Sequence, residues 1–427
     1  MINWCYHMKI KTSTPDLELS SNERLYLKKT TFSPKNFTNI KPKSFKIYTL
    51  NTGMKKKQDD LLVIIFNKIV NVSSVYSKTS TPSAPIIWDK INNKGKCKVL
   101  IVNSGNANAH TGKRGIETIN NYVEKIMTFL KCKKSEVLVS STGVIGEFLN
   151  PEIISKNLIN LKNHKDKKLL DAAKAIMTTD TYPKIFKNAV KINDKNINIY
   201  GIAKGAGMIY PNMGTMLAYI FIDADISKKI LNKLLIENLE NSFNSISVDG
   251  DTSTSDTLFL FSSGTNKVNL NSKKNYKKIS NMLYLTMINL AKKVVMDGEG
   301  ISKLMEIEVV NAKTKSQATN IAFAVSNSLL VKTAISGQDA NWGRVIMAIG
   351  KTGEKILQDK LKLFFGSIQV CEKGCVKKNL NMKSLDKYMK KNIINIKIDL
   401  GIGNFNRRVF GNDLTKEYLR INADYRS

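Results

Sequence analysis

The sequence predicts a protein of the α/β class. Short apolar runs with the character of strands recur along the chain, and amphipathic helical patterns lie between them. Strands that alternate with helices favour this class. The chain has 427 residues, of which 42% are hydrophobic. A chain of this length can bury a large core and is expected to hold two or three structural units.

Residues 1–40 come first and have low apolar content, with several Ser, Thr, Lys and Asn residues and no clear period. We interpret them as a poorly ordered N-terminal extension. The predicted strands then follow, each a short apolar run of strand-like length and composition. They are LLVIIF (61–66), KVLIVNSG (98–105), EVLVSS (136–141), MLAYIFI (216–222), LFLFSS (258–263) and NIAFAVS (320–326).

Helical patterns separate these runs. Ile116, Ile119, Tyr122, Val123, Ile126 and Leu130 fall on one face of a helix. The same holds for Ile230, Leu231, Leu234, Leu235 and Leu239, with Ser227 as the predicted N-cap. A third helix is predicted over about residues 277–296.

The charge of the chain raises the question of a nucleic-acid partner. The formal net charge is +32, from 67 Lys and Arg against 35 Asp and Glu. The basic residues are mostly Lys, spread along the chain, and they accompany no aromatic and basic RNA motif, zinc finger or basic helix. We therefore expect solvated basic surfaces and no nucleic-acid function, although such a surface can attract anionic substrates.

Other composition signals limit the compartment and the chemistry. No apolar run reaches the ~20 residues needed to span a bilayer, and the N-terminus lacks the apolar core of a secretory signal. The five cysteines are scattered, which argues for a reducing compartment and predicts a cytoplasmic protein. None of the three histidines, His7, His110 and His164, lies in a motif typical of a catalytic His. No cluster has metal-ligand spacing, so we expect no metal and no cofactor.

Thr215 is the candidate nucleophile. It lies where the Gly-rich segment GIAKGAGMIYPNMG (201–214) runs into the apolar strand pattern. A threonine hydroxyl needs an adjacent base, and cleavage of the chain before Thr215 would free an α-amine that can serve as that base. Taken alone, a Thr at such a junction is more often a simple turn or strand residue.

The motifs around Thr215 favour the nucleophile over a simple turn or strand residue. The segment KGAGMIYPNMGTML (204–217) resembles the nucleophile segment of the glutamate N-acetyltransferases, also called ornithine acetyltransferases, of arginine biosynthesis. Further blocks resemble that family in the family's order, over roughly residues 40–427. They are VNSGNANAHTG (102–112), SSTGVIG (140–146), IMTTDTYPK (176–184), VDGDTSTSDT (248–257), DGEG (297–300), DANWGR (339–344) and INADYRS (421–427).

The resemblance implies the fold and the division of the chain. The expected fold is a layered α-β-β-α sandwich with a smaller C-terminal α/β unit. Self-cleavage between Gly214 and Thr215 would give an alpha chain of residues 41–214 and a beta chain of residues 215–427. Two alpha and two beta chains are expected to associate. The family often has Ala where Gly214 stands, and glycine there makes the loop more flexible, so cleavage is expected to be slower.

The resemblance also implies the site residues. Thr142 and Gly143 are the expected donors to the oxyanion, because a hydroxyl and an unobstructed backbone N–H can both point at a developing negative charge. The expected substrate-binding residues, with Thr215 itself, are Thr178, Lys204, Glu299, Asn422 and Ser427. Ser427 replaces the Thr common in the family and keeps the hydroxyl. Without the resemblance, Thr142 and Gly143 would be a plain turn and Glu299 an exposed loop acid.

The implied activity is transfer of acetyl from N2-acetylornithine to glutamate through an acetyl ester on Thr215. Members that also use acetyl-CoA share these motifs, so the sequence leaves that donor open; the lack of a recognised Gly-rich phosphate loop favours recycling of acetyl alone. The alternative is an N-terminal-nucleophile aminopeptidase or amidohydrolase that passes the acyl group to water. The amino-acid contacts expected at Glu299 and Asn422 argue against that hydrolase.

Overall fold

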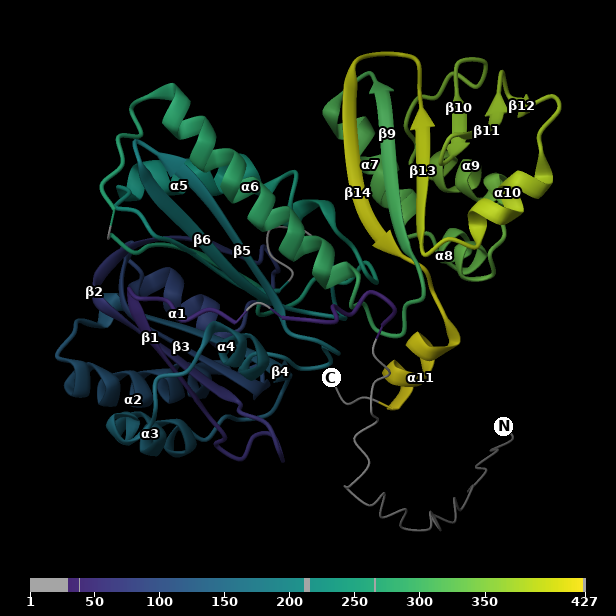
Figure 1. The fold of residues 1–427 in the computed structure, drawn as a ribbon. Helices are drawn as coiled ribbons and strands as arrows, with labels where there is room; N and C mark the ends of the chain where they lie inside the picture. The colour runs from purple at the N-terminus through teal and green to yellow at the C-terminus, as the bar shows by residue number, and fades with distance from the viewer. Residues whose placement is uncertain (1–29, 38, 211–215, 265, 425–427) are drawn as a thin grey trace, which may run out of the picture.

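The computed structural model describes residues 30–37, 39–210, 216–264 and 266–424. A larger layered body is followed by a smaller C-terminal body (Figure 1), and each is built on one sheet. The strands of the larger body are β1 (Phe45–Leu50), β2 (Leu61–Tyr76), β3 (Lys96–Asn106), β4 (Val137–Val144), β5 (Lys184–Ile192), β6 (Lys195–Lys204), β7 (Leu217–Ile222) and β8 (Thr257–Ser262). Its helices are α1 (Ala84–Asn92), α2 (Gly112–Leu130), α3 (Pro151–Ile159), α4 (Leu169–Ala175), α5 (Lys228–Leu239) and α6 (Lys273–Val295).

The long strand β2 joins the two halves of the larger body. The strand order is β4-β3-β2-β8-β7-β6-β5, with β1 also paired to β2. The first part of β2 pairs with β1 and β3, and its last six residues, Asn71–Tyr76, pair antiparallel with β8. The β2–β3 register shifts between Ile65 and Val70, so β2 passes from one half of the sheet to the other at that point.

Three apolar clusters define the layers. One lies between the two halves of the sheet and contains aromatic side chains of β1, β2, β7 and β8, including Phe45, Phe66, Phe221 and Phe261. A second fills the space between the first half and helices α1, α2 and α3. A third packs the second half against α5 and α6. The layer order is therefore α-β-β-α, and Figure 1 shows the α5–α6 layer and the α2–α3 layer on opposite sides.

The apolar faces read from the sequence are the faces that these helices bury. In α2, Ile119, Tyr122, Val123 and Ile126 are buried. In α5, Leu231, Leu234, Leu235 and Leu239 are buried, and Ser227 occupies the N-cap position, although its side chain makes no capping hydrogen bond. The third predicted helix corresponds to α6, which begins four residues earlier and ends one residue earlier than predicted.

One predicted strand is wrong. Residues 320–326 form the end of helix α7 (Lys315–Ser326). The helix begins at an N-cap, because Thr314 accepts a hydrogen bond from the backbone N–H of Gln317. Buried residues recur at helical spacing, at positions 318, 321, 322 and 325. In a short apolar run, alanine-rich helix and buried strand look alike until the capping residues are considered.

The smaller body carries the second sheet. Its strands are β9 (Leu304–Ala312), β10 (Lys362–Phe365), β11 (Ile368–Glu372), β12 (Cys375–Val376), β13 (Ile393–Asp399) and β14 (Phe405–Asn412), in the order β12-β11-β10-β13-β9-β14. Its helices are α7, α8 (Leu329–Ser336), α9 (Trp342–Gly350) and α10 (Met382–Met389), and they share one apolar core with the sheet. The last helix, α11 (Lys416–Asp424), leaves this body and returns toward the sandwich (Figure 1).

The predicted α/β class and the layered α-β-β-α sandwich with a C-terminal α/β unit are confirmed. The described part of the N-terminal segment contacts the sandwich: the Thr30 hydroxyl donates to the Met296 carbonyl at 2.9 Å, and Ile40 is buried. None of the helices in the described ranges is long and apolar enough to cross a membrane.

Candidate active site

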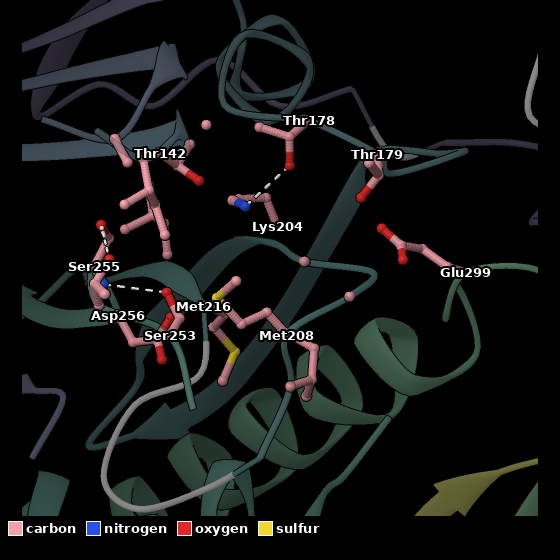
Figure 2. A pocket seen from close by; sticks show the side chains of 18 of the residues that line it. Thr142, Thr178, Thr179, Lys204, Met208, Met216, Ser253, Ser255, Asp256 and Glu299 are labelled. Carbon is pink, nitrogen blue, oxygen red and sulfur yellow. Dashed lines mark hydrogen bonds between the residues drawn. The ribbon is translucent and has the colours of Figure 1, made fainter. Parts of the chain in front are cut away.

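A polar cavity of about 120 Å³ lies where several strands of the sandwich end. Six of the residues that the sequence singled out line it, and Figure 2 shows four of them labelled around its opening. They are Thr142, Gly143, Thr178, Lys204, Glu299 and Asn422. Gly214, Thr215 and Ser427 lie outside the described residues, but Met216, which follows Thr215 in the chain, also lines the cavity.

Thr142 and Gly143 occupy the end of β4, beside the end of β3. Gly143 has φ +133°, and a Cβ added there would lie 2.3 Å from the carbonyl carbon of Gly105 on the paired strand. Only glycine allows this close approach of the two backbones. The result is a bend that leaves Thr142 buried against the cavity. This geometry suits the presentation of a hydroxyl and a backbone N–H to an anionic oxygen.

Lys204 is the last residue of β6 and reaches across the cavity toward the loop after α4. Its Nζ donates to the Thr178 hydroxyl at 3.1 Å, the contact drawn in Figure 2. Burial lowers the pKa of Lys204, and the nearby carboxylates of Asp180, Asp256 and Glu299 oppose that effect. A partly desolvated ammonium at this place can bind an anionic group of a small substrate.

Glu299 enters the cavity from the segment after α6 and is only 7% exposed. Its Oε2 accepts a hydrogen bond of 2.9 Å from Asn422 Nδ2, which brings α11 to the cavity. A Cβ on Gly207 would lie 2.6 Å from the Glu299 carboxyl group, so glycine at 207 leaves room for it. Burial raises the pKa of Glu299. A buried carboxylate of this kind is a receptor for an ammonium group.

Sequence reasoning missed one wall of the cavity, the segment before β8. Ser253, Thr254, Ser255 and Asp256 line it. Figure 2 shows Ser253, Ser255 and Asp256 grouped on the side of Thr142 and Met216. Asp256 is 4% exposed, and its Oδ2 has no hydrogen-bond partner among the described residues. Burial raises its pKa well above the usual value. The available signal was the VDGDTSTSDT block, in which an acid directly precedes a buried strand.

His110, Cys371 and Cys375 lie outside the cavity. His110 is an exposed loop residue with φ +57°. Cys371 is buried and Cys375 exposed, and both are free thiols. Among the residues that the structure describes, no group of three or more His, Cys, Asp or Glu side chains has the arrangement of a metal site.

A layered sandwich with a threonine-, lysine- and glutamate-lined cavity at its strand ends defines an enzyme that acts on small charged substrates. The comparisons with known proteins agree, because the chain belongs to the ArgJ family, whose model matches residues 46–427. It is 42% identical over 388 residues to the arginine biosynthesis bifunctional protein ArgJ of Bartonella henselae, covering 90% of this chain and 95% of that protein. The ArgJ protein of Bradyrhizobium diazoefficiens is 43% identical, with the same coverage.

Two solved structures are also similar. The crystal structure of arginine biosynthesis bifunctional protein ArgJ from Bacillus halodurans matches with a TM-score of 0.44 and 34% identity, over 48% of this chain and 96% of that one. Ornithine acetyltransferase of Mycobacterium tuberculosis, solved with ornithine, matches with a TM-score of 0.37 and 27% identity, over 40% of this chain and 93% of that one.

Proposed function

We propose that this protein is a glutamate N-acetyltransferase that moves acetyl from N2-acetylornithine to glutamate. The observation that carries the proposal is the single cavity in which Thr142, Gly143, Lys204 and Glu299 meet beside the start of β7. Membership of the ArgJ family over residues 46–427 supports the same activity. Both substrates carry carboxylates and ammonium groups, which match the cation of Lys204 and the carboxylate of Glu299.

The proposed reaction has two steps with Thr215 as nucleophile. The Thr215 hydroxyl attacks the acetyl carbonyl of N2-acetylornithine, and the α-amine of Thr215 takes its proton. The C–N bond then breaks, the proton passes to the ornithine nitrogen, and an acetyl ester remains on Thr215. In the second step the neutral amine of glutamate attacks the ester carbonyl and gives a proton to the α-amine of Thr215. The ester C–O bond breaks, N-acetylglutamate leaves, and the same proton passes to the Thr215 oxygen to restore the hydroxyl. Thr142 and Gly143 stabilise the oxyanion in both steps.

The free α-amine requires cleavage between Gly214 and Thr215, which we propose occurs within the folded chain. Fresh protein on a denaturing gel should then show two bands near half-length, and Thr215→Ala should abolish both cleavage and turnover. A single full-length band from fully active protein would contradict the free-amine mechanism. We further propose that two alpha and two beta chains associate, which size-exclusion chromatography with light scattering would measure.

The activity is tested with pure protein, N2-acetylornithine and glutamate. Ornithine and N-acetylglutamate should appear in equal amounts, whereas no ornithine above background would overturn the assignment. Omitting glutamate and measuring acetate identifies a hydrolase, because only water then accepts the acetyl group. Replacing N2-acetylornithine by acetyl-CoA tests the second donor: a comparable rate would identify it, and no rate would restrict the enzyme to recycling.

A further inference from the structure

Asp180, Lys184 and Asp297 form a buried cluster of charges outside the proposed chemistry. Lys184 Nζ lies 2.5 Å from Asp180 Oδ1 and 2.6 Å from Asp297 Oδ2, and all three side chains are fully buried. Burying such groups costs desolvation energy, and packed apolar residues often replace them without loss of stability. Stability alone therefore gives a weak reason for the cluster.

The carboxylate of Asp180 also holds two segments of the cavity wall. Its Oδ2 accepts the backbone N–H of Thr178 at 2.9 Å, and its Oδ1 accepts the backbone N–H of Gly205 at 2.7 Å. Thr178 belongs to the loop after α4, and Gly205 follows Lys204 at the end of β6. One side chain thus fixes the two segments whose side chains make the Lys204–Thr178 hydrogen bond.

The carboxylate of Asp180 also favours the charged form of Lys204. The ionisable groups that face Lys204 are Asp180, Asp256 and Glu299, which favour its charged form, and Lys184, which opposes it. Asp180 has the strongest effect of these four groups. Asp297 has a backbone contact of its own: it accepts the N–H of Thr181 at 2.9 Å.

We infer that Asp180 is a positioning residue, which fixes the Thr178 and Lys204 segments against each other and supplies the negative charge that balances the Lys204 ammonium. The inference rests on the proposed function, because it assigns Lys204 to the binding of an anionic substrate group. Lys184 and Asp297 have a supporting part: they hold the Asp180 carboxylate in one orientation.

The test is the pH dependence of kcat/KM in Asp180→Asn, with Asp297→Asn as the matched control. Without the Asp180 charge, Lys204 loses its proton at lower pH. The alkaline limb of the profile, where kcat/KM falls at high pH, should therefore move to lower pH by about one unit or more, and KM should rise. Asp297→Asn removes a carboxylate from the same cluster but leaves both backbone contacts of Asp180. Its alkaline limb should stay where the wild-type limb lies.

Two further variants identify the titrating group and guard against misfolding. In Lys204→Arg the guanidinium stays protonated, so the limb should be absent, and adding Asp180→Asn should not restore it. Asp180→Glu keeps the charge but displaces the carboxylate, so KM should rise while the limb stays in place. It provides the readout if Asp180→Asn does not fold.

A wild-type pH profile in a folded Asp180→Asn protein would overturn the inference. So would an equal shift in Asp297→Asn, a limb that persists in Lys204→Arg, or a wild-type KM in Asp180→Glu. Failure of the proposed function gives a different result, since the wild-type protein would then form no ornithine before any variant is compared.

Discussion

Glu299→Gln should separate binding from stability. The side chain is 7% exposed, and burial raises its pKa, so its ionised form costs the folded state free energy near neutral pH. An acid whose pKa is raised in the folded state contributes most to the free energy of unfolding at low pH. That contribution is lost as the pH rises through the pKa of the folded state. Gln has the same shape, and its carbonyl oxygen can still accept from Asn422. Thermal stability at pH 7 should therefore stay unchanged or rise.

The activity of Glu299→Gln should fall. A hydrogen bond to a charged partner contributes about 1.5–3 kcal/mol, and each ~1.4 kcal/mol is a factor of ten in rate. Loss of one such bond to the ammonium of N2-acetylornithine or glutamate predicts a decrease in kcat/KM of about 10- to 150-fold. Steady-state ornithine formation and calorimetric melting on the same samples measure both effects.

The matched control is Glu308→Gln, which removes an acid from β9. Glu308 pairs with Arg408 at 2.7 Å, and neither residue lines the cavity. Its kcat/KM should stay within about twofold of wild type, as for a surface ion pair. The reasoning on Glu299 is refuted if Glu299→Gln melts several degrees lower and loses activity only in proportion to the unfolded fraction, because its role would then be structural.

Three further predictions concern the oxyanion bend, the missed acid and the charge of the surface. Thr142→Ala should lower kcat by about 10²–10³-fold with little change in melting temperature. Gly143→Ala should lower kcat and the melting temperature, because its Cβ would meet the backbone of Gly105. A Gly143→Ala protein that melts at the wild-type temperature would contradict the close approach of the two strands. Burial raises the pKa of Asp256, so Asp256→Asn should increase the free energy of unfolding, and the increase should grow as the pH rises above the usual aspartate pKa. Urea unfolding of wild type and variant at pH 4 and pH 7 measures this difference. A difference that does not change with pH would disprove the raised pKa. Binding to duplex DNA should be lost by ~0.2 M salt, and retention there would restore the nucleic-acid hypothesis.

Much of the fold could be predicted from the sequence because its signals are local. Buried strands such as 216–222 are continuous apolar runs, and α2 and α5 have one apolar face each. The strands β1, β5, β6 and β9–β14 were not predicted, since polar residues interrupt most of them, as in KIFKNAVKI at 184–192. The run at 320–326 was assigned to the wrong class because its alanines and β-branched residues fit both classes.

Of the candidate site, too, only part could be predicted from the sequence. The motifs pointed to Thr142, Lys204 and Glu299, but no local pattern shows that Asp180 and Asp297, 117 positions apart, share one lysine. The role of Asp256 was missed for the same reason. Its Oδ2 is buried without a hydrogen-bond partner among the described residues, and burial of that kind depends on the packing of distant elements.

The strand order gives the proposed self-cleavage a consequence for assembly. Strands β7 and β8 would belong to the beta chain, yet β7 pairs with β6 and β8 pairs with β2, both from the alpha chain. The two beta-chain strands are thus inserted between alpha-chain strands, with six residue pairs on each side. We expect these two strand pairings to form while the chain is continuous, because forming both between separate fragments has a high entropic cost. Folding must therefore precede cleavage, and the mature enzyme would be an interlocked pair of chains that separate expression of the halves should fail to rebuild.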